Sequence, residues 1–84
     1  MPSRKTYKYR IKDGNRIVYY GTTHDLERRE REHRNDGMDF TKMEKVGQIT
    51  TNAAAGAWEE ENIKRYMQQH GGKRPKYNLN DTGK

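Results

Sequence analysis

The sequence has 84 residues, of which 29% are hydrophobic and 36% are charged, and it contains no cysteine. Without cysteine, disulfides and thiolate zinc sites are excluded, so any metal needs carboxylate, histidine or substrate oxygen ligands. Eighteen Lys and Arg against twelve Asp and Glu give a formal net charge of +6, which favours a polyanionic partner, nucleic acid first. The length predicts one small domain, residues 1–84. No apolar run resembles a secretion signal or a membrane span, so we expect no membrane partner and a cytoplasmic location.

Residues 5–12 predict a half-buried strand, because apolar and basic residues alternate along them. One face of this strand is aromatic or aliphatic: Tyr7, Tyr9 and Ile11. The other face is basic: Lys8, Arg10 and Lys12. The basic face suits contact with a nucleic-acid backbone.

The turn signal Asp13-Gly14-Asn15 follows this strand. Residues 17–21 are β-branched or aromatic and predict a second strand. A three-residue loop over residues 13–15 would pair Lys12 with Arg16. In that register Ile11 faces Ile17 and Tyr9 faces Tyr19, whereas a two-residue loop would break this alignment.

A helix is predicted over about residues 25–35. At about 100° per residue, His33 lies roughly 20° from Leu26 and Arg29 lies about 60° from it. An inward helix face that holds arginine and histidine is unusual for a purely structural role. The alternative is that Arg29 is a snorkelling surface residue and His33 a half-buried filler.

The ends of this helix and the next strand have weaker signals. Thr23 or His24 is expected near the helix cap, and Asn35-Asp36-Gly37 is expected to end it. Residues 42–50 alternate weakly in hydrophobicity and predict a third strand with a bulge near Gly47.

A second helix is predicted from Ala53 to about Gln69. Thr51-Asn52 caps its start, Gly56 interrupts it, and Gly71-Gly72 ends it. We expect residues 73–80 to be extended and residues 81–84 to form a frayed tail.

One acidic residue falls in the apolar stripe of the second helix. The stripe consists of Ala55, Ile63 and Tyr66, which lie at roughly −40°, +40° and −20° from Glu59. Glu59 is therefore predicted to point at the sheet, whereas Glu60 and Glu61 take flanking and solvent faces. A buried carboxylate needs a cation. Here the cation is either Arg29, in a structural ion pair, or one Mg²⁺ that also keeps waters and substrate phosphate as ligands.

The predicted order of elements is β-β-α-β-α. This order describes a small α+β domain with a three-stranded, mainly antiparallel sheet flanked by helices. Paired tyrosines, an arginine, a histidine and an inward glutamate on a basic domain suit phosphodiester cleavage, with a metal to polarise the phosphate. The alternative is a non-catalytic nucleic-acid-binding module that uses basic strands and aromatic rings.

The motifs, taken in order, resemble those of the GIY-YIG nuclease family, which includes homing endonucleases, some restriction enzymes and the incision subunit of bacterial excision repair. Tyr7-Lys8-Tyr9 stands where Gly-Ile-Tyr is typical, and Tyr19-Tyr20-Gly21 stands where Tyr-Ile-Gly is typical. Residues 22–33 resemble the family's helix, with its arginine and a histidine four residues later. The spacing of Ala55, Glu59 and Ile63 is similar to that around the family's metal-binding glutamate, and residues 75–78 resemble its closing segment.

The resemblance implies a GIY-YIG-type fold and hydrolysis of DNA with one Mg²⁺ or Mn²⁺ ion on Glu59. The implied site residues are Tyr9, Tyr19, Arg29, His33, Glu59 and Asn78, with Asn80 as a rival to Asn78. Either tyrosine could be the base, and the family analogy favours Tyr9. The basic residues expected to contact DNA are Lys8, Arg10, Lys12, Arg28, Lys73 and Arg74. RNA remains open as a substrate, and so does a homodimer or a separate specificity partner, because family members usually carry separate DNA-binding regions.

Overall fold

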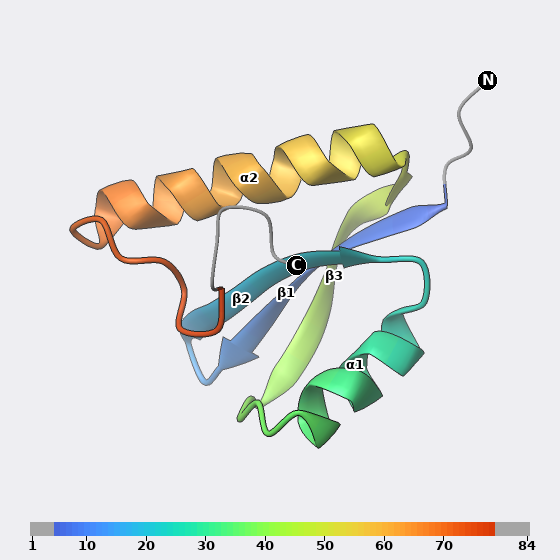
Figure 1. Ribbon diagram of the computed structural model, residues 1–84, viewed down its shortest axis with the longest axis horizontal. Helices are drawn as coiled ribbons and strands as arrows, with labels where there is room; N and C mark the ends of the chain where they lie inside the picture. The colour runs from blue at the N-terminus through green and yellow to red at the C-terminus, as the bar shows by residue number, and fades with distance from the viewer. Residues whose placement is uncertain (1–4, 79–84) are drawn as a thin grey trace.

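The computed structural model describes residues 5–78, which form a three-stranded antiparallel sheet and two helices. In chain order the elements are β1 (Thr6–Asp13), β2 (Arg16–Thr23), α1 (Leu26–Asn35), β3 (Lys42–Thr50) and α2 (Asn52–Gln69). β1 is the central strand, and the strands lie between α2 on one side and α1 on the other (Figure 1). The predicted α+β fold and element order are confirmed. Asn80 and the predicted tail over residues 81–84 lie outside the described residues.

The β1–β2 turn is one residue shorter than the predicted loop. Asp13 pairs with Arg16, so Gly14 and Asn15 alone connect the strands. Gly14 has φ +64°, a conformation that glycine adopts without steric cost. The predicted three-residue loop is therefore wrong, and so are the direct pairs that it implied between Ile11 and Ile17 and between Tyr9 and Tyr19.

A bulge in β2 restores the proximity of the two tyrosines. Lys12 pairs with Ile17, but Ile11 pairs with Tyr19, so Val18 is an extra residue in β2. An extra residue shifts the register by one and exchanges the two faces of the strand beyond it. Tyr19 consequently shares a face with Ile11 and Tyr9, and lies diagonally across from Tyr9.

β3 has the predicted bounds and the predicted bulge. Its register against β1 shifts between Thr6, which pairs with Thr50, and Lys8, which pairs with Val46. Gly47 lies inside this irregular stretch with φ +64°, where a residue with a side chain would be strained.

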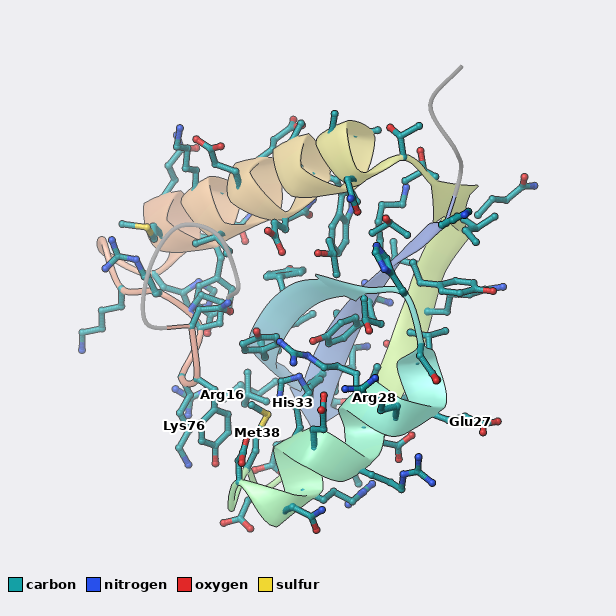
Figure 2. All side chains as sticks on the ribbon, turned by 45° about the vertical axis from the view of Figure 1, so that its right-hand side comes forward. Arg16, Glu27, Arg28, His33, Met38 and Lys76 are labelled. Carbon is teal, nitrogen blue, oxygen red and sulfur yellow. The ribbon has the colours of Figure 1, made fainter. Side chains whose placement is uncertain are left out.

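The first helix is capped one or two residues later than predicted. Asp25 is the N-cap residue, and its carboxylate accepts a hydrogen bond from the backbone N–H of Arg28 at 3.1 Å. An aspartate here satisfies a free helix N–H and suits the positive end of the helix dipole. His33 is the buried residue of α1 and lies on the side that faces the sheet, whereas Glu27 points away from it (Figure 2).

The second helix starts one residue before the predicted Ala53, ends at the predicted Gln69 and is not interrupted. The Thr51 side chain caps it by accepting a hydrogen bond from Ala54 N at 3.2 Å. The helix continues through Gly56, because a single glycine costs a helix less than about 1 kcal/mol and leaves its hydrogen bonds intact. At the end, Gly71 and Gly72 adopt positive φ. Neither helix in residues 5–78 is both long enough and apolar enough to cross a bilayer.

The segment after α2 covers the outer edge of β2. Tyr77 N donates a hydrogen bond to Val18 O at 2.9 Å, and Asn78 N turns back to Pro75 O at 3.0 Å. The described part of the segment therefore contains a turn at residues 76–77. The prediction that the segment is extended is wrong at these residues. Covering an edge strand satisfies backbone groups that would otherwise be open to other chains.

The core consists of two groups of buried residues, one in the β1–β2 hairpin and one on α2. The buried cluster of Tyr9, Ile11, Val18 and Tyr19 packs against partly buried side chains: Leu26, Met38, Phe40, Met43 and Tyr77. The buried residues of α2 are Ala55, Glu59, Ile63 and Tyr66, as the helical periodicity predicted. Tyr9 and Tyr19, two of the six predicted site residues, therefore lie in the first group, and Glu59 belongs to the second.

Candidate active site

Two tyrosines and a glycine form the floor of the site. The rings of Tyr9 and Tyr19 stack with centroids 5.9 Å apart, and both residues are buried. Tyr9 pairs across the strands with Gly21. A Cβ added to Gly21 would come within 2.5 Å of the Tyr9 hydroxyl and 2.6 Å of the Tyr19 ring. The two phenols can lie side by side only because this position has no side chain.

His33 reaches the tyrosines from α1. Its Nε2 atom lies 2.7 Å from the Tyr9 hydroxyl, and its ring meets the edge of the Tyr19 ring at a centroid distance of 4.9 Å. Burial lowers the pKa of His33 below its usual value, and the positive charge of Arg29 lowers it further. His33 is therefore neutral at neutral pH, and one of its ring nitrogens is free to accept a proton.

The ionisation of the tyrosines is governed mainly by burial. Burial raises the pKa of Tyr9 far above its usual value, Tyr19 adds to the effect, and Arg29 opposes it through a hydrogen bond and its charge. The pKa of Tyr19 is also raised, again chiefly by burial, while Arg29 and Tyr9 act to lower it. Both phenols are therefore protonated at neutral pH.

Arg29 is in the first half of α1 and lies beside the tyrosine hydroxyls. Its Nε atom is buried and has no hydrogen-bond partner among the described residues, and its side chain is 35% exposed. Its ion pair is made with Glu32, from Nη1 to Oε1 at 3.3 Å. The predicted alternative of a structural pair between Arg29 and Glu59 is thus not the arrangement that this arginine adopts.

Glu59 is the buried carboxylate that periodicity selected from three adjacent glutamates. It is 2% exposed, whereas its neighbours pair on the outer surface of α2, Glu60 with Lys64 and Glu61 with Arg65. The negative charge of Glu59 raises the pKa of Tyr19, so the carboxylate lies within electrostatic range of that tyrosine. Glu59 is the part of the site that comes from α2.

The chemistry of the donor set fits a lightly held magnesium ion. Within residues 5–78 no three His, Asp or Glu side chains lie close enough to form a metal cage. Mg²⁺ usually keeps several waters and is often bound by one or two carboxylates together with substrate phosphates. A single buried carboxylate such as Glu59 is compatible with that mode of binding, in which the substrate supplies further ligands.

Asn78 contacts the strand that carries Tyr19 and Gly21, through the backbone of Tyr20. Its side chain is buried and bonds both backbone groups of Tyr20, accepting from the N–H at 2.9 Å and donating to the C=O at 3.0 Å. Tyr20 stands between Tyr19 and Gly21, so this clamp holds the part of β2 that carries them. Asn78 is thus placed to hold the backbone of β2 in position.

The basic residues predicted to contact nucleic acid fall into two groups. Arg10 and Lys12 form ion pairs with Glu44. Their Nε and Nζ atoms lie 2.8 Å and 3.5 Å from Glu44 Oε1. Hydrogen bonds from Lys42 and Arg10 lower the pKa of Glu44 to about 2, so these cations already have an anionic partner. The other predicted cations lie elsewhere: Lys8 lies over the Trp58 ring, and Arg28, Lys73 and Arg74 are exposed.

Three residues near the site were not identified from the sequence. Gly21 stands in the motif Tyr19-Tyr20-Gly21 without a predicted role of its own, and only the cross-strand register reveals its contact with both phenols. Glu32 bonds two arginines of α1, and its spacing of three and four residues from them could have indicated this. Trp58 meets Tyr20 edge to face, at a centroid distance of 5.8 Å.

The chain matches no protein-family model, no curated protein and no solved structure.

Proposed function

We propose that this chain is the core of a divalent-metal-dependent endonuclease of the GIY-YIG type, which hydrolyses DNA phosphodiester bonds. One observation carries the proposal. Tyr9, Tyr19, His33 and Arg29 meet at one place, and the charge of Glu59 acts on Tyr19. Four elements of the chain contribute to this cluster, which a merely solvated basic surface would not require.

Tyr9 and His33 form a path for the proton of the attacking water. Because Tyr9 keeps its proton at neutral pH, it acts as a relay: it accepts a proton from water while its own hydroxyl proton passes to Nε2 of His33, 2.7 Å away. This requires the tautomer with the proton on Nδ1, which the lowered pKa of His33 permits. The water oxygen bonds to phosphorus, the bond to the leaving oxygen breaks, and that oxygen is protonated by solvent.

Arg29 stabilises the charge that develops on the phosphate. A guanidinium binds phosphate oxygens through two parallel N–H bonds, and donors held in place before the reaction are worth more than those that must reorient. Arg29 remains protonated throughout, because its hydrogen bond to Tyr9 raises its pKa still further.

Glu59 would hold a single Mg²⁺ or Mn²⁺ ion. The ion would supply charge stabilisation at the phosphate and the leaving oxygen. Glu59 itself contributes a fixed anionic oxygen donor on a rigid helix, and its neighbours in the sequence are unsuited because they point to solvent.

A second candidate is a nucleic-acid-binding module without catalysis. The observation that favours it is the group formed by Lys8, Trp58 and Tyr20, in which a cation and two aromatic rings lie together. Aromatic rings with a nearby cation are typical of surfaces on which bases stack. A pure binder, however, has no use for the buried carboxylate of Glu59.

The test is a plasmid-cleavage assay. With Mg²⁺ or Mn²⁺ we expect purified protein to nick or cut supercoiled DNA, and Glu59→Gln to abolish this while the circular dichroism spectrum stays unchanged. Glu60→Gln and Glu61→Gln are matched controls from the same run of glutamates and should retain cleavage. Full activity in Glu59→Gln would exclude the proposed metal ligand, and binding without cleavage in the unaltered protein would favour the second candidate.

A further inference from the structure

A hollow of about 250 Å³ adjoins the site at the start of α1. Its lining residues come from the β2–α1 connection and the first turns of the helix: Thr23, His24, Asp25, Arg28, Arg29 and Glu32. Arg29 belongs both to this hollow and to the tyrosine cluster. The hollow is thus connected to the candidate active site through Arg29.

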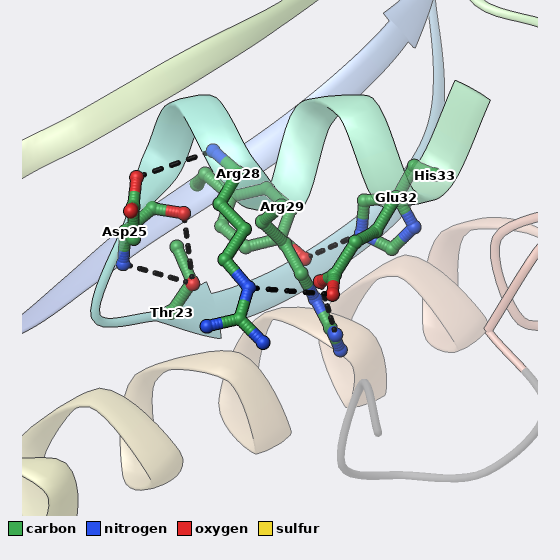
Figure 3. A network of polar contacts seen from close by, with 7 residues as sticks. Thr23, Asp25, Arg28, Arg29, Glu32 and His33 are labelled. Atoms are coloured by element: carbon green, nitrogen blue, oxygen red, sulfur yellow. Dashed lines mark hydrogen bonds and ion pairs between the residues drawn. The ribbon is translucent and has the colours of Figure 1, made fainter. Parts of the chain in front are cut away.

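Glu32 connects the two arginines of the hollow. Its carboxylate accepts from Arg29 Nη1 at 3.3 Å and lies 3.6 Å from Arg28 Nε, and both arginines lie one helical turn before it (Figure 3). The other acid, Asp25, is engaged with the backbone N–H of Arg28 as the helix cap. Glu32 is therefore the anion that the two guanidinium groups share.

This arrangement does not saturate the arginines. Both contacts are long, the Glu32 side chain is 42% exposed and the Arg28 side chain 70% exposed. Exposed pairs of this kind contribute little to stability because water competes with them. Arg29 Nε is buried without a hydrogen-bond partner among residues 5–78. A phosphate, with more acceptor oxygens than a carboxylate, would satisfy these donors better.

We propose that the hollow binds a DNA phosphate adjacent to the cleaved one, and that Glu32 is the internal counter-anion which this phosphate displaces. Arg28 makes the main contact to the adjacent phosphate, while Arg29 remains on the cleaved phosphate. The inference rests on the proposed function in one respect, that DNA is the substrate. Beyond that function, Arg28 would make a second phosphate contact, and Glu32 would weaken the affinity for DNA.

The first experiment measures binding of a fluorescein-labelled 20-base-pair duplex by anisotropy, in EDTA so that no cleavage occurs. Glu32→Gln should bind about two- to fivefold more tightly than the unaltered protein, since it removes a weak competing ion pair. The matched control is Glu30→Gln. Glu30 is on the same helix, is also 42% exposed and pairs with Arg34 at 3.3 Å, so its substitution makes the same change in net charge. A smaller gain is expected from Glu30→Gln.

The second experiment measures how the affinity depends on salt. Arg28→Ala should reduce the slope of log K against log salt by about 1, the value for one lost phosphate contact. The exposed Arg31, on the same helix, serves as the control, and Arg31→Ala should change the slope less.

The results separate this inference from the proposed function. Equal effects of Glu32→Gln and Glu30→Gln, equal slopes for Arg28→Ala and Arg31→Ala, or no DNA binding at all would overturn the inference. Cleavage that depends on Glu59 could persist in the first two cases. Conversely, if Glu59→Gln left cleavage unchanged while Glu32→Gln and Arg28→Ala behaved as expected, the hollow would stand as a phosphate site and the catalytic assignment would fall.

Discussion

The hydroxyl of Tyr9 lies over the backbone of Gly21, its partner across β1 and β2, in the space that a Cβ at position 21 would occupy. The Tyr19 ring borders the same space. The glycine is thus a steric requirement of the tyrosine pair, and not a requirement of the backbone, since its φ lies outside the positive region. The arrangement of the two phenols depends on a residue that has no side chain.

Gly21→Ala should therefore destabilise the protein. The added methyl would contact Tyr9 and Tyr19 at distances that require the rings to move, and overpacking of this kind costs about 1–3 kcal/mol. Urea unfolding measures the change. The same substitution at Gly56, where α2 leaves open space around the new methyl, should instead stabilise the protein by about 0.5–1 kcal/mol. Equal changes at the two glycines would contradict the steric account.

Removal of the Tyr9 hydroxyl tests the proton relay. Tyr9→Phe should lower kcat for DNA cleavage by about 10²–10⁴-fold, the usual contribution of a positioned proton-transfer group, and should leave DNA affinity within about twofold. Tyr7→Phe is the matched control on the same strand and should change neither quantity appreciably. The relay is excluded if Tyr9→Phe cleaves at the rate of the unaltered protein.

The buried histidine predicts a pH-dependent stability. Folding lowers the pKa of His33, so the unfolded chain binds more protons at pH values between the lowered pKa and the usual value near 6.5. The free energy of unfolding should then rise with pH across this window and reach its full value above it. The effect of Glu44, whose pKa falls from 4.5 to about 2, lies at lower pH and is separable.

Urea unfolding of the unaltered protein and His33→Gln at pH 5, 6, 7 and 8 measures this effect. The stability advantage of the unaltered protein over His33→Gln should shrink as the pH falls from 7 to 5, because only the unaltered protein has the His33 imidazole, which takes up a proton when the chain unfolds. A constant difference would show that the protonation of His33 is not linked to folding.

The two hydrogen bonds from Asn78 to the backbone of Tyr20 predict that removing the Asn78 side chain destabilises the protein. Asn78→Ala removes two hydrogen bonds from the backbone of Tyr20, and such a loss at a buried site costs about 1–3 kcal/mol. Asn62 is a suitable comparison, since its side chain bonds only the helical carbonyl of Trp58 at 2.8 Å. Asn62→Ala should change the free energy of unfolding by about 0.5 kcal/mol or less. A loss at Asn78 no larger than that at Asn62 would remove the positioning role.

The sequence by itself determined the elements and the inward residues. Alternation predicted β1, helical periodicity selected Glu59 from three adjacent glutamates, and the same periodicity put His33 on the inner face of α1. These predictions succeeded because each depends only on the geometry of one helix or strand, which repeats along the chain.

Contacts between elements were decided only by the tertiary structure. The bulge at Val18 could not be read from alternation, because one extra residue exchanges the faces of a strand without changing its composition. The predicted loop length was wrong, but the predicted proximity of Tyr9 and Tyr19 was right. The two residues are diagonal neighbours across the strands, and their rings stack. The choice of Glu32 over Glu59 as the partner of Arg29 follows from proximity on α1: a pair on one helix needs no long-range contact, whereas Glu59 must arrive with α2.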